Sequence, residues 1–399
     1  MILIISCVFP PEPVVSATLS KDIADKLSLF HDVVVIHPKP TRPDGYQFDQ
    51  EKIVFNYESI TVDSFTCSTY SVVGRLKESY SFGLKCAEYI IANKQKIDVI
   101  YLNAWALFAQ YRIIKTAKRF GIPCVMHVQD IYPESFTNRL PIVLKKLALN
   151  IFLPIDKFVL KNSKKIIVIS NSMKQFLHDT RKLEKQNISV VYNWQDEKKF
   201  LNYNNQKEKH IKNKLFIFMY LGNLGSYSCV DVIVNAFSKL NYPNTKLIIA
   251  GSGSMKKKLQ VQAQDLNISI DFIDVPSKDV PEIQSFADIL LLTVKTGGAK
   301  TGMPSKLSAY MFSGKPIIAC IDPDSDSADV IRKSDCGWIV EPENVDSLSK
   351  KMEEVITMQT AQLTEMGKRG CEYALEHFSR EKNVSKVVQI ILDTKNNEK

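Results

Sequence analysis

The segment TGGAKTGMPSKLSAYMFSGKP (residues 296–316) lies between two apolar runs, ILLLTV (289–294) and PIIAC (316–320). Short apolar runs rich in leucine and isoleucine are typical of buried strands. Pro304 suits the first turn of a helix, where its missing N–H is not needed. The segment therefore predicts a strand, a glycine-rich loop, a short helix and a second strand, an order typical of parallel α/β proteins.

Apolar runs alternate with segments of helical period through the rest of the chain. In the first half they are ILIISCVF (2–9), DVVVIHP (32–38), VIYLN (99–103), CVMHVQD (124–130), IIVIS (166–170) and SVVYN (189–193). In the second half they are FIFMYLG (216–222), KLIIAG (246–251), IDFID (270–274) and GWIVEP (337–342). The alternation predicts an α/β protein with two doubly wound, Rossmann-like domains.

The domain boundary is predicted from length and composition. A chain of 399 residues suits two domains, because one domain usually holds about 100–200 residues. Residues 196–214 are polar, rich in asparagine and without apolar period, so we expect a linker or surface excursion there. The predicted domains are residues 1–195 and 196–377, and residues 378–399 form a helix long enough to pack elsewhere.

The composition disfavours several classes of protein. No run approaches the roughly 18 apolar residues that a membrane-spanning helix needs. The eight cysteines form no CxxC pair, which favours a reducing compartment and no structural zinc. The N-terminal apolar run lacks a basic flank and is followed by prolines, so it is interpreted as a buried strand and not a secretory signal. We therefore expect a cytoplasmic protein.

The formal charge of +9 suits phosphorylated substrates, anionic lipid or nucleic acid as partners. Nucleic acid is disfavoured because no recognised reader motif accompanies the charge. Basic and apolar residues mix from Arg139 to Lys165, a pattern that allows peripheral contact with anionic lipid on the inner face of the plasma membrane. A helix pair covering the first sheet, with its lysines outward, explains the same pattern.

Glycine turns follow three strands of the second half. YLGNLG (220–225) and AGSGS (250–254) each end a strand and open a helix, where backbone N–H groups bind phosphate. Plain strand-to-helix turns or tight packing explain these glycines equally well. In the third turn, a diphosphate would meet the N–H groups of Ser305 and Lys306 and the Lys306 ammonium, with Lys300 nearby. The alternative is a flexible loop with a solvated Lys306.

Polar side chains of the first half are the candidates for acceptor binding. His127, Gln129, Asp130 and Glu134 follow a strand, and such groups can orient sugar hydroxyls. His127 and Gln129 are explained equally well as hydrogen-bonded polar core residues. Glu12 and Ser16 lie in the first strand-to-helix connection, where Ser16 can also cap the helix.

The acidic run IDPDSDSAD (321–329) resembles the spacing of a calcium loop but lacks its glycine and closing glutamate. A solvated turn and helix cap is therefore favoured, and no metal site is predicted.

The chain resembles glycosyltransferase family 4, in particular the lineage of bacterial surface-polysaccharide enzymes that includes colanic-acid and O-antigen fucosyl- or N-acetylfucosaminyltransferases. The likeness extends over nearly the whole chain. It rests on the motifs FPPEP, VQDIYPES, YNWQDEKKF, YLGNLG, IIAGSGS, ADILLLTV, MPSKLSAYMFSGKPIIA and CGWIVEP.

The resemblance implies a GT-B fold with two domains facing a cleft, the nucleotide on the second domain, the acceptor largely on the first, and the last helix returning to the first. It also implies retaining transfer without metal or cofactor. The expected donor is a UDP-linked sugar, and the expected acceptor is a glycan or an undecaprenyl-diphosphate-linked acceptor. The donor-binding residues are predicted to be Gly222, Asn223, Gly251, Gly253, Lys300, Thr301, Gly302, Met303, Pro304, Ser305 and Lys306, with Lys306 and Asp130 catalytic.

Two departures from the family pattern stand out. Thr301 and Ala309 replace a pair of glutamates, the second of which usually holds the ribose. Asn223 and Ser228 replace the usual arginine and lysine, which leaves Lys306 and Lys300 as the phosphate cations. The missing glutamates leave a catalytically silent scaffold protein open as an alternative. A non-hydrolysing nucleotide-sugar epimerase, which shares the same two-domain architecture, is a second alternative.

Overall fold

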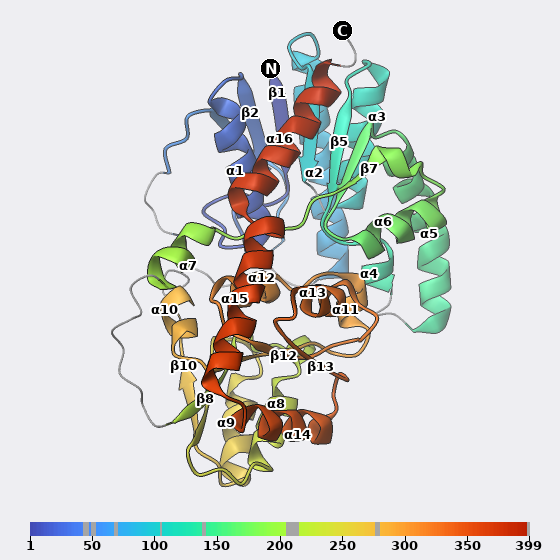
Figure 1. The fold of residues 1–399 in the computed structure, drawn as a ribbon. Helices are drawn as coiled ribbons and strands as arrows, with labels where there is room; N and C mark the ends of the chain where they lie inside the picture. Colours follow the sequence, from blue (N-terminus) through green and yellow to red (C-terminus); the bar gives the residue numbers. More distant parts are fainter. Residues whose placement is uncertain are drawn as a thin grey trace. The chain divides into compact units, whose positions relative to one another are not determined.

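The structure is a computed structural model that describes residues 1–42, 48, 53–67, 71–103, 106–137, 141–204, 215–275 and 280–396. The chain divides into two compact units, one of Met1–Asn193 with Asn383–Lys399 and one of Trp194–Lys382 (Figure 1). Each unit contains one parallel sheet with helices packed against it.

The first unit holds a seven-stranded sheet in the order β3-β2-β1-β4-β5-β6-β7, with every pair parallel. The order reverses at β1, which pairs with β2 on one side and β4 on the other, so a ligand-binding crevice is expected beyond β1 and β4. The strands are β1 (Ile2–Ser6), β2 (Val33–Pro38), β3 (Glu58–Val62), β4 (Val99–Asn103), β5 (Cys124–Val128), β6 (Lys165–Val168) and β7 (Ile188–Val190). The helices are α1 (Val15–Ser28), α2 (Val72–Asn93), α3 (Leu107–Arg119), α4 (Glu134–Thr137), α5 (Ile142–Lys161) and α6 (Asn171–Arg181).

The second unit holds a six-stranded parallel sheet in the order β10-β9-β8-β11-β12-β13. Its order reverses at β8, which pairs with β9 and β11. The strands are β8 (Phe216–Leu221), β9 (Thr245–Ala250), β10 (Ile270–Ile273), β11 (Ile289–Thr293), β12 (Ile317–Cys320) and β13 (Gly337–Val340). The helices are α7 (Glu197–Asn204), η3 (Ser226–Ser228), α8 (Val230–Ser238), α9 (Lys256–Asp265), α10 (Val280–Ser285), α11 (Gly298–Thr301), α12 (Ser305–Phe312), α13 (Asp326–Ser334), α14 (Val345–Ile356) and α15 (Thr360–His377).

Inner strands of both sheets include some that are buried along their whole length. Residues 2–6 of β1, 99–103 of β4 and 289–293 of β11 are all buried. Continuous apolar runs are typical of parallel strands covered by helices on both faces, which is why these strands could be recognised in the sequence.

Helix α16 (Arg380–Asn396) begins in the second unit, and its residues from Asn383 onward belong to the first. The Asn383 amide donates to the carbonyl oxygen of Tyr192 at 3.1 Å, and the Lys395 ammonium lies 3.3 Å from the Asp98 carboxylate. These contacts attach the C-terminal helix to the first unit.

Two local predictions were wrong. The start of the polar stretch at 196–214 is not irregular, because Glu197–Asn204 form α7, whose Phe200 is buried with its ring 5.9 Å from that of Phe312. Residues 205–214 lie outside the described residues. Ser16 does not cap α1, since the helix begins at Val15 after an extended Val14.

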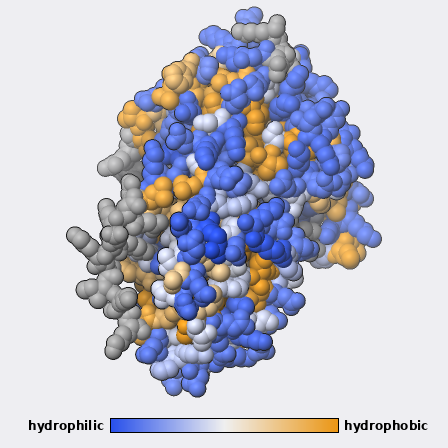
Figure 2. Space-filling view, in the orientation of Figure 1, coloured by the Kyte–Doolittle hydropathy of each residue, from blue (hydrophilic) through white to orange (hydrophobic). Residues whose placement is uncertain are grey.

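Helix α5 is buried in its second half and exposed in its first. Phe152, Val159 and Leu160 are buried, whereas five apolar side chains near the N-terminus are more than half exposed. These are Ile142, Val143, Leu144, Leu147 and Ile151. Figure 2 shows an orange patch at the right edge, where Figure 1 shows the start of α5. Arg139, from which the mixed segment was expected to begin, lies outside the described residues.

Within the described residues no helix is both long and apolar enough to cross a lipid bilayer.

Candidate active site

The glycine turns after β8 and β9 pack on each other in the second unit. The Gly222 N–H donates to the Ala250 carbonyl at 2.9 Å, and the Leu224 N–H donates to the Ser252 carbonyl at 2.8 Å. A Cβ on Gly251 would lie 2.0 Å from the Gly222 carbonyl oxygen, and Gly251 has a φ of +135°. The backbones approach too closely for any side chain here.

Gly253 also has no room for a side chain. Its φ is +151°, and a Cβ would lie 2.6 Å from the Leu224 carbonyl group and 2.7 Å from Asn223 Oδ1. Tight packing thus accounts for Gly251 and Gly253, and a phosphate contact of these turns stays a prediction.

Lys306 extends from the first turn of α12 across the Gly222 turn. A Cβ on Gly222 would lie 2.7 Å from Lys306 Cδ, and Gly222 has a φ of +155°. The ammonium donates to the Tyr220 hydroxyl and lies 4.4 Å from the centre of the Tyr220 ring. The Tyr220 hydroxyl donates in turn to the Asn223 carbonyl at 2.9 Å.

No carboxylate forms an ion pair with Lys306 within the described residues. Burial therefore lowers the pKa of Lys306 to about 8, because the charged form loses solvation. An anion bound here would supply the missing counter-charge.

The first turn of α12 presents unpaired donors. The N–H groups of Ser305 and Lys306 donate to no acceptor in the described part of the chain, and Ser305 is exposed. Pro304, at the helix N-cap, has no N–H. Free N–H groups and the positive end of the helix dipole make this terminus suited to an anion.

Gly302 and Met303 precede this turn and are half-buried. The side chains of Lys300 and Thr301 lie outside the described residues, so their predicted contacts with the donor stay predictions.

Two carboxylates that the sequence analysis did not assign to the site hold the glycine loop before α11. Asp322 accepts from the Gly297 N–H at 2.9 Å and 3.0 Å, and Glu343 accepts from the Thr296 N–H at 3.1 Å and from its hydroxyl at 2.6 Å. The expectation of a solvated acidic run was therefore wrong for Asp322, which is buried. The expected helix cap is confirmed, because the Ser325 hydroxyl accepts from the Ala328 N–H at the start of α13.

The first unit contains a cavity of about 700 Å³ at the carboxyl ends of β4 and β5. Four of the residues predicted on the acceptor side line it, namely Ser16, His127, Gln129 and Asp130. Apolar walls come from Leu76, Phe108, Tyr132 and Phe136, and Arg75 adds a cation. A cavity with apolar walls and a few polar groups is the usual form of a small-molecule site.

His127 is buried and hydrogen-bonded at both ring nitrogens. Its Nδ1 lies 2.6 Å from the Tyr101 hydroxyl and its Nε2 lies 2.9 Å from the Gln129 amide. Burial lowers the pKa of His127 to about 3, so the ring is neutral at physiological pH. His127 is therefore a hydrogen-bonded polar residue of the core. Gln129 bonds to His127 and also lines the cavity.

Glu134 is engaged by a partner that the sequence did not predict. Both of its carboxylate oxygens accept from the Arg181 guanidinium, at 2.7 Å and 2.6 Å. Arg181 is fully buried and also donates to Asp156 at 2.7 Å and to the Tyr132 carbonyl at 3.1 Å. These contacts give Glu134 a structural role in holding the segment that carries Tyr132.

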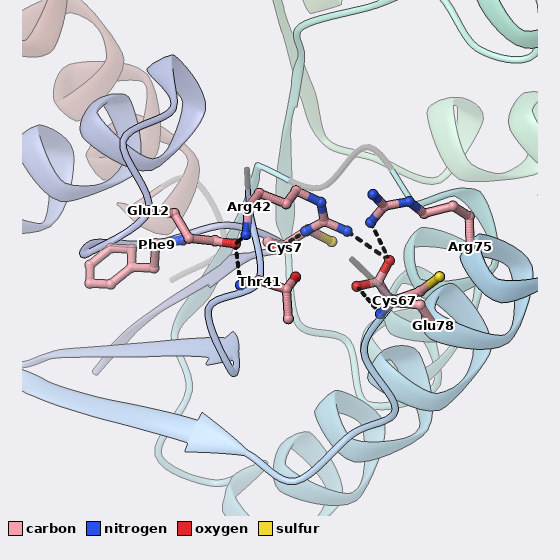
Figure 3. A network of polar contacts seen from close by, with 8 residues as sticks. All are labelled: Cys7, Phe9, Glu12, Thr41, Arg42, Cys67, Arg75 and Glu78. Carbon is pink, nitrogen blue, oxygen red and sulfur yellow. Dashed lines mark hydrogen bonds and ion pairs between the residues drawn. The ribbon is translucent and has the colours of Figure 1, made fainter. Parts of the chain in front are cut away.

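Glu12 likewise receives protein donors instead of facing the cavity (Figure 3). It is buried and accepts from the N–H groups of Phe9 at 3.2 Å, Thr41 at 2.8 Å and Arg42 at 2.9 Å. Burial raises the pKa of Glu12, an effect that these N–H groups oppose. The Arg42 guanidinium continues the network to Glu78 at 2.7 Å.

Glu78 also binds Arg75 at 3.0 Å, so this network ends at a residue that lines the cavity. Glu12 therefore fastens the loop after β1 to the segment after β2.

Within the described residues no group of three or more histidine, cysteine, aspartate or glutamate side chains could hold a metal ion.

Two family models match the chain in succession. "Glycosyltransferase Family 4" matches residues 17–199, and "Glycosyl transferases group 1" matches residues 202–373. The chain is a glycosyltransferase of family 4.

Relatives of this glycosyltransferase are distant in sequence. WbjE of Pseudomonas aeruginosa, named as a glycosyltransferase, is 22% identical over 311 residues, which cover 73% of each chain. WcaI of Escherichia coli (strain K12), whose name assigns it to colanic acid biosynthesis, is 24% identical over 343 residues, covering 80% of this chain and 82% of WcaI. The predicted likeness to surface-polysaccharide enzymes is confirmed at the level of the family and its distant members, and not for a particular sugar.

Solved structures share the fold of this glycosyltransferase. Alr3699/HepE of Anabaena, in complex with UDP, superposes with a TM-score of 0.72 at 14% identity, covering 98% of this chain and 99% of HepE. Sucrose-phosphate synthase of Thermosynechococcus elongatus gives 0.74 at 16% identity, covering 98% and 97%. The predicted GT-B class, with two parallel α/β sheets, is confirmed.

The structure shows what surrounds the replaced family residues of this glycosyltransferase. Ala309 is buried inside α12, next to Tyr310, whose hydroxyl bonds to the backbone of Leu221. The Ser228 hydroxyl donates to the Asn223 carbonyl at 2.8 Å. Neither Ala309 nor Ser228 supplies a charge, so Lys306 is the cation nearest the Gly222 turn for which the structure gives contacts.

Proposed function

We propose that this glycosyltransferase transfers a sugar, with retention and without a metal ion, from a UDP-linked donor to a growing lipid-linked glycan of a bacterial surface polysaccharide. The observation that carries the proposal is the half-buried Lys306 ammonium beside the Gly222 turn and the unpaired N–H groups of α12. HepE, which shares the fold, has been solved with UDP and with UDP-glucose. WcaI is named for a polysaccharide pathway.

The reaction needs stabilisation of the leaving nucleotide diphosphate. As the glycosidic bond loosens, negative charge grows on the diphosphate oxygens. The Lys306 ammonium and the N–H groups of Ser305 and Lys306 are fixed before the reaction, so they stabilise this charge without reorganising. Lys306 is half-buried and has already lost part of its solvation, which makes its attraction to an anion stronger than that of an exposed lysine.

The acceptor hydroxyl attacks from the same face of the sugar from which the leaving group departs. The leaving phosphate takes the proton of this hydroxyl. On the acceptor side, Asp130 and Gln129 at the cavity wall orient the hydroxyls by hydrogen bonds. Asp130 stays the catalytic candidate of the first unit.

Helix α5 supports an acceptor held at a lipid surface. Its exposed residues Leu144, Leu147 and Ile151 recur at helical spacing, with Lys145 and Lys146 among them. Residues 142–155 contain no acidic side chain. Apolar side chains beside lysines suit the interface of an anionic bilayer, and we infer peripheral contact of α5 with the inner face of the plasma membrane.

The test combines ligand binding with turnover. Nucleotide sugars are screened for thermal stabilisation, since a ligand at about 100 times its dissociation constant adds about 2.7 kcal/mol. The stabilising donor is then assayed for transfer to lipid-linked glycans with wild type, Lys306→Ala and the control Lys239→Ala, whose lysine pairs with Asp346 on the surface. We expect turnover in wild type and the control and its loss in Lys306→Ala.

Equal turnover in all three proteins would remove Lys306 from the mechanism. Conversion of the nucleotide sugar without any acceptor would favour the epimerase alternative, and no affinity for any nucleotide sugar would favour the scaffold alternative.

A further inference from the structure

Tyr101, His127 and Gln129 form one hydrogen-bonded chain that leads from the core of the first unit to its cavity. Tyr101 lies on β4 and is fully buried, His127 lies on the neighbouring strand β5, and Gln129 follows β5 at the cavity wall. The two links of the chain are 2.6 Å and 2.9 Å long. Both lie in the usual range for hydrogen bonds.

The number of protons on these three side chains decides which atom donates in each hydrogen bond. Within the described residues, the Tyr101 hydroxyl has no hydrogen-bond partner other than His127 Nδ1. If Nδ1 carried the ring proton, the Tyr101 O–H would be a buried donor without an acceptor, which is costly. The Tyr101 O–H therefore donates to Nδ1. Because the ring is neutral, its proton then lies on Nε2.

A protonated Nε2 needs an acceptor, and Gln129 offers one only through its amide oxygen. The amide nitrogen is the atom placed 2.9 Å from Nε2, so the terminal amide must turn by half a rotation. The Gln129 NH₂ group then points away from His127, on a side chain that lines the cavity.

We propose that Tyr101 is a positioning residue that acts through the Nε2–H form of His127 and turns the Gln129 NH₂ group toward the cavity. There the NH₂ group donates a hydrogen bond to an oxygen of the glycan. The proposal rests on the proposed function for the identity of the ligand. It names the chemistry that the cavity wall selects: an oxygen that accepts a hydrogen bond, such as a ring oxygen, a hydroxyl oxygen or an acetamido carbonyl.

The other lining residues agree with a sugar at this wall. Phe108, Tyr132 and Phe136 supply aromatic faces for the C–H face of a sugar ring. Arg75, a second donor, lines the same cavity. A ligand placed there meets two donor groups beside apolar walls.

Nitrogen NMR of the full-length protein tests the first half of the proposal without any substrate. Protein labelled with ¹⁵N-histidine distinguishes the two neutral ring forms by the shifts of Nδ1 and Nε2, and His127→Asn identifies the signal. We expect the Nε2–H form for His127. The Nδ1–H form would overturn the proposal whatever the protein catalyses.

Kinetics test the second half. Gln129→Glu keeps an oxygen for the His127 Nε2–H but replaces the NH₂ donor by an acceptor. We expect the KM for the glycan acceptor to rise by about five- to tenfold or more, with the KM for the nucleotide sugar unchanged. Tyr101→Phe should raise the acceptor KM similarly and shift the His127 signal toward the Nδ1–H form.

An unchanged acceptor KM in a folded Gln129→Glu protein would refute the assignment. If Tyr101→Phe does not fold, the wild-type NMR signal and Gln129→Glu still decide. A wild-type protein that transfers no sugar but shows the Nε2–H form would refute the proposed function and leave the hydrogen-bond chain standing.

Discussion

Removing the buried Arg181 guanidinium should destabilise the first unit by about 3–5 kcal/mol, the usual cost of leaving one partner of a buried ion pair alone. Arg181 has no exposed side-chain surface, and its partners Asp156 and Glu134 are 8% and 21% exposed. Arg181→Met keeps most of the side-chain volume but leaves both carboxylates without their cation. The midpoint of guanidinium chloride unfolding should fall by about 1 M.

The loss should depend on pH. Burial raises the pKa of Asp156 to about 6 even though Arg181 lowers it, so without Arg181 the pKa must rise further. A carboxyl group with a higher pKa in the folded state binds protons more readily when folded. The stability of Arg181→Met therefore falls as pH rises from about 4, the pKa of an aspartate in the unfolded chain, through the higher pKa of Asp156 in the folded protein. Arg181→Met should lose less stability at pH 5 than at pH 8.

Arg332→Met is the matched control, because Arg332 forms an ion pair with Asp329 on the surface and its side chain is 50% exposed. Its effect should stay within about 0.5 kcal/mol. A loss below about 1 kcal/mol in Arg181→Met at pH 8, or a larger loss at pH 5 than at pH 8, would refute this reasoning.

Two further perturbations test the loop packing and the lipid surface. Gly251→Ala places a Cβ 2.0 Å from the Gly222 carbonyl oxygen, so the melting temperature should fall by several degrees, whereas Gly302→Ala meets open space and should change little; equal melting temperatures would contradict the packing argument. Leu147→Asp with Ile151→Asp should abolish sedimentation with vesicles containing anionic phospholipid, while Val261→Asp, at an exposed position of α9, should not. Unchanged sedimentation of the double variant would contradict the role of α5.

The buried strands could be predicted because each is a short apolar run. The ends of these runs then predicted where the strands end. Strand β3 was not predicted, since all five residues of Glu58–Val62 are exposed or half-buried and present no apolar run. It lies at the edge of its sheet, where burial leaves the weakest pattern.

The sequence could predict only those site residues whose role shows in their own short motif. Lys306 and Gly222 were chosen from their own motifs, and the structure brings them together. The partners of Glu12 and Glu134 lie about 30 and 47 residues away along the chain, so the sequence could not show that Arg42 and Arg181 engage these carboxylates. Asp322 and Glu343 were missed for the same reason, because their partners in the Thr296–Gly297 loop are distant in sequence.

The central claim is that Lys306 meets the diphosphate of the donor, and its pKa of about 8 makes this measurable. Titration calorimetry of UDP binding at pH 8, in buffers of different ionisation enthalpy, reports the protons taken up. A bound anion raises the pKa of Lys306, so wild type should take up roughly half a proton. Lys306→Met should bind at least about tenfold more weakly with no uptake, and equal affinity with no uptake in either protein would contradict the account.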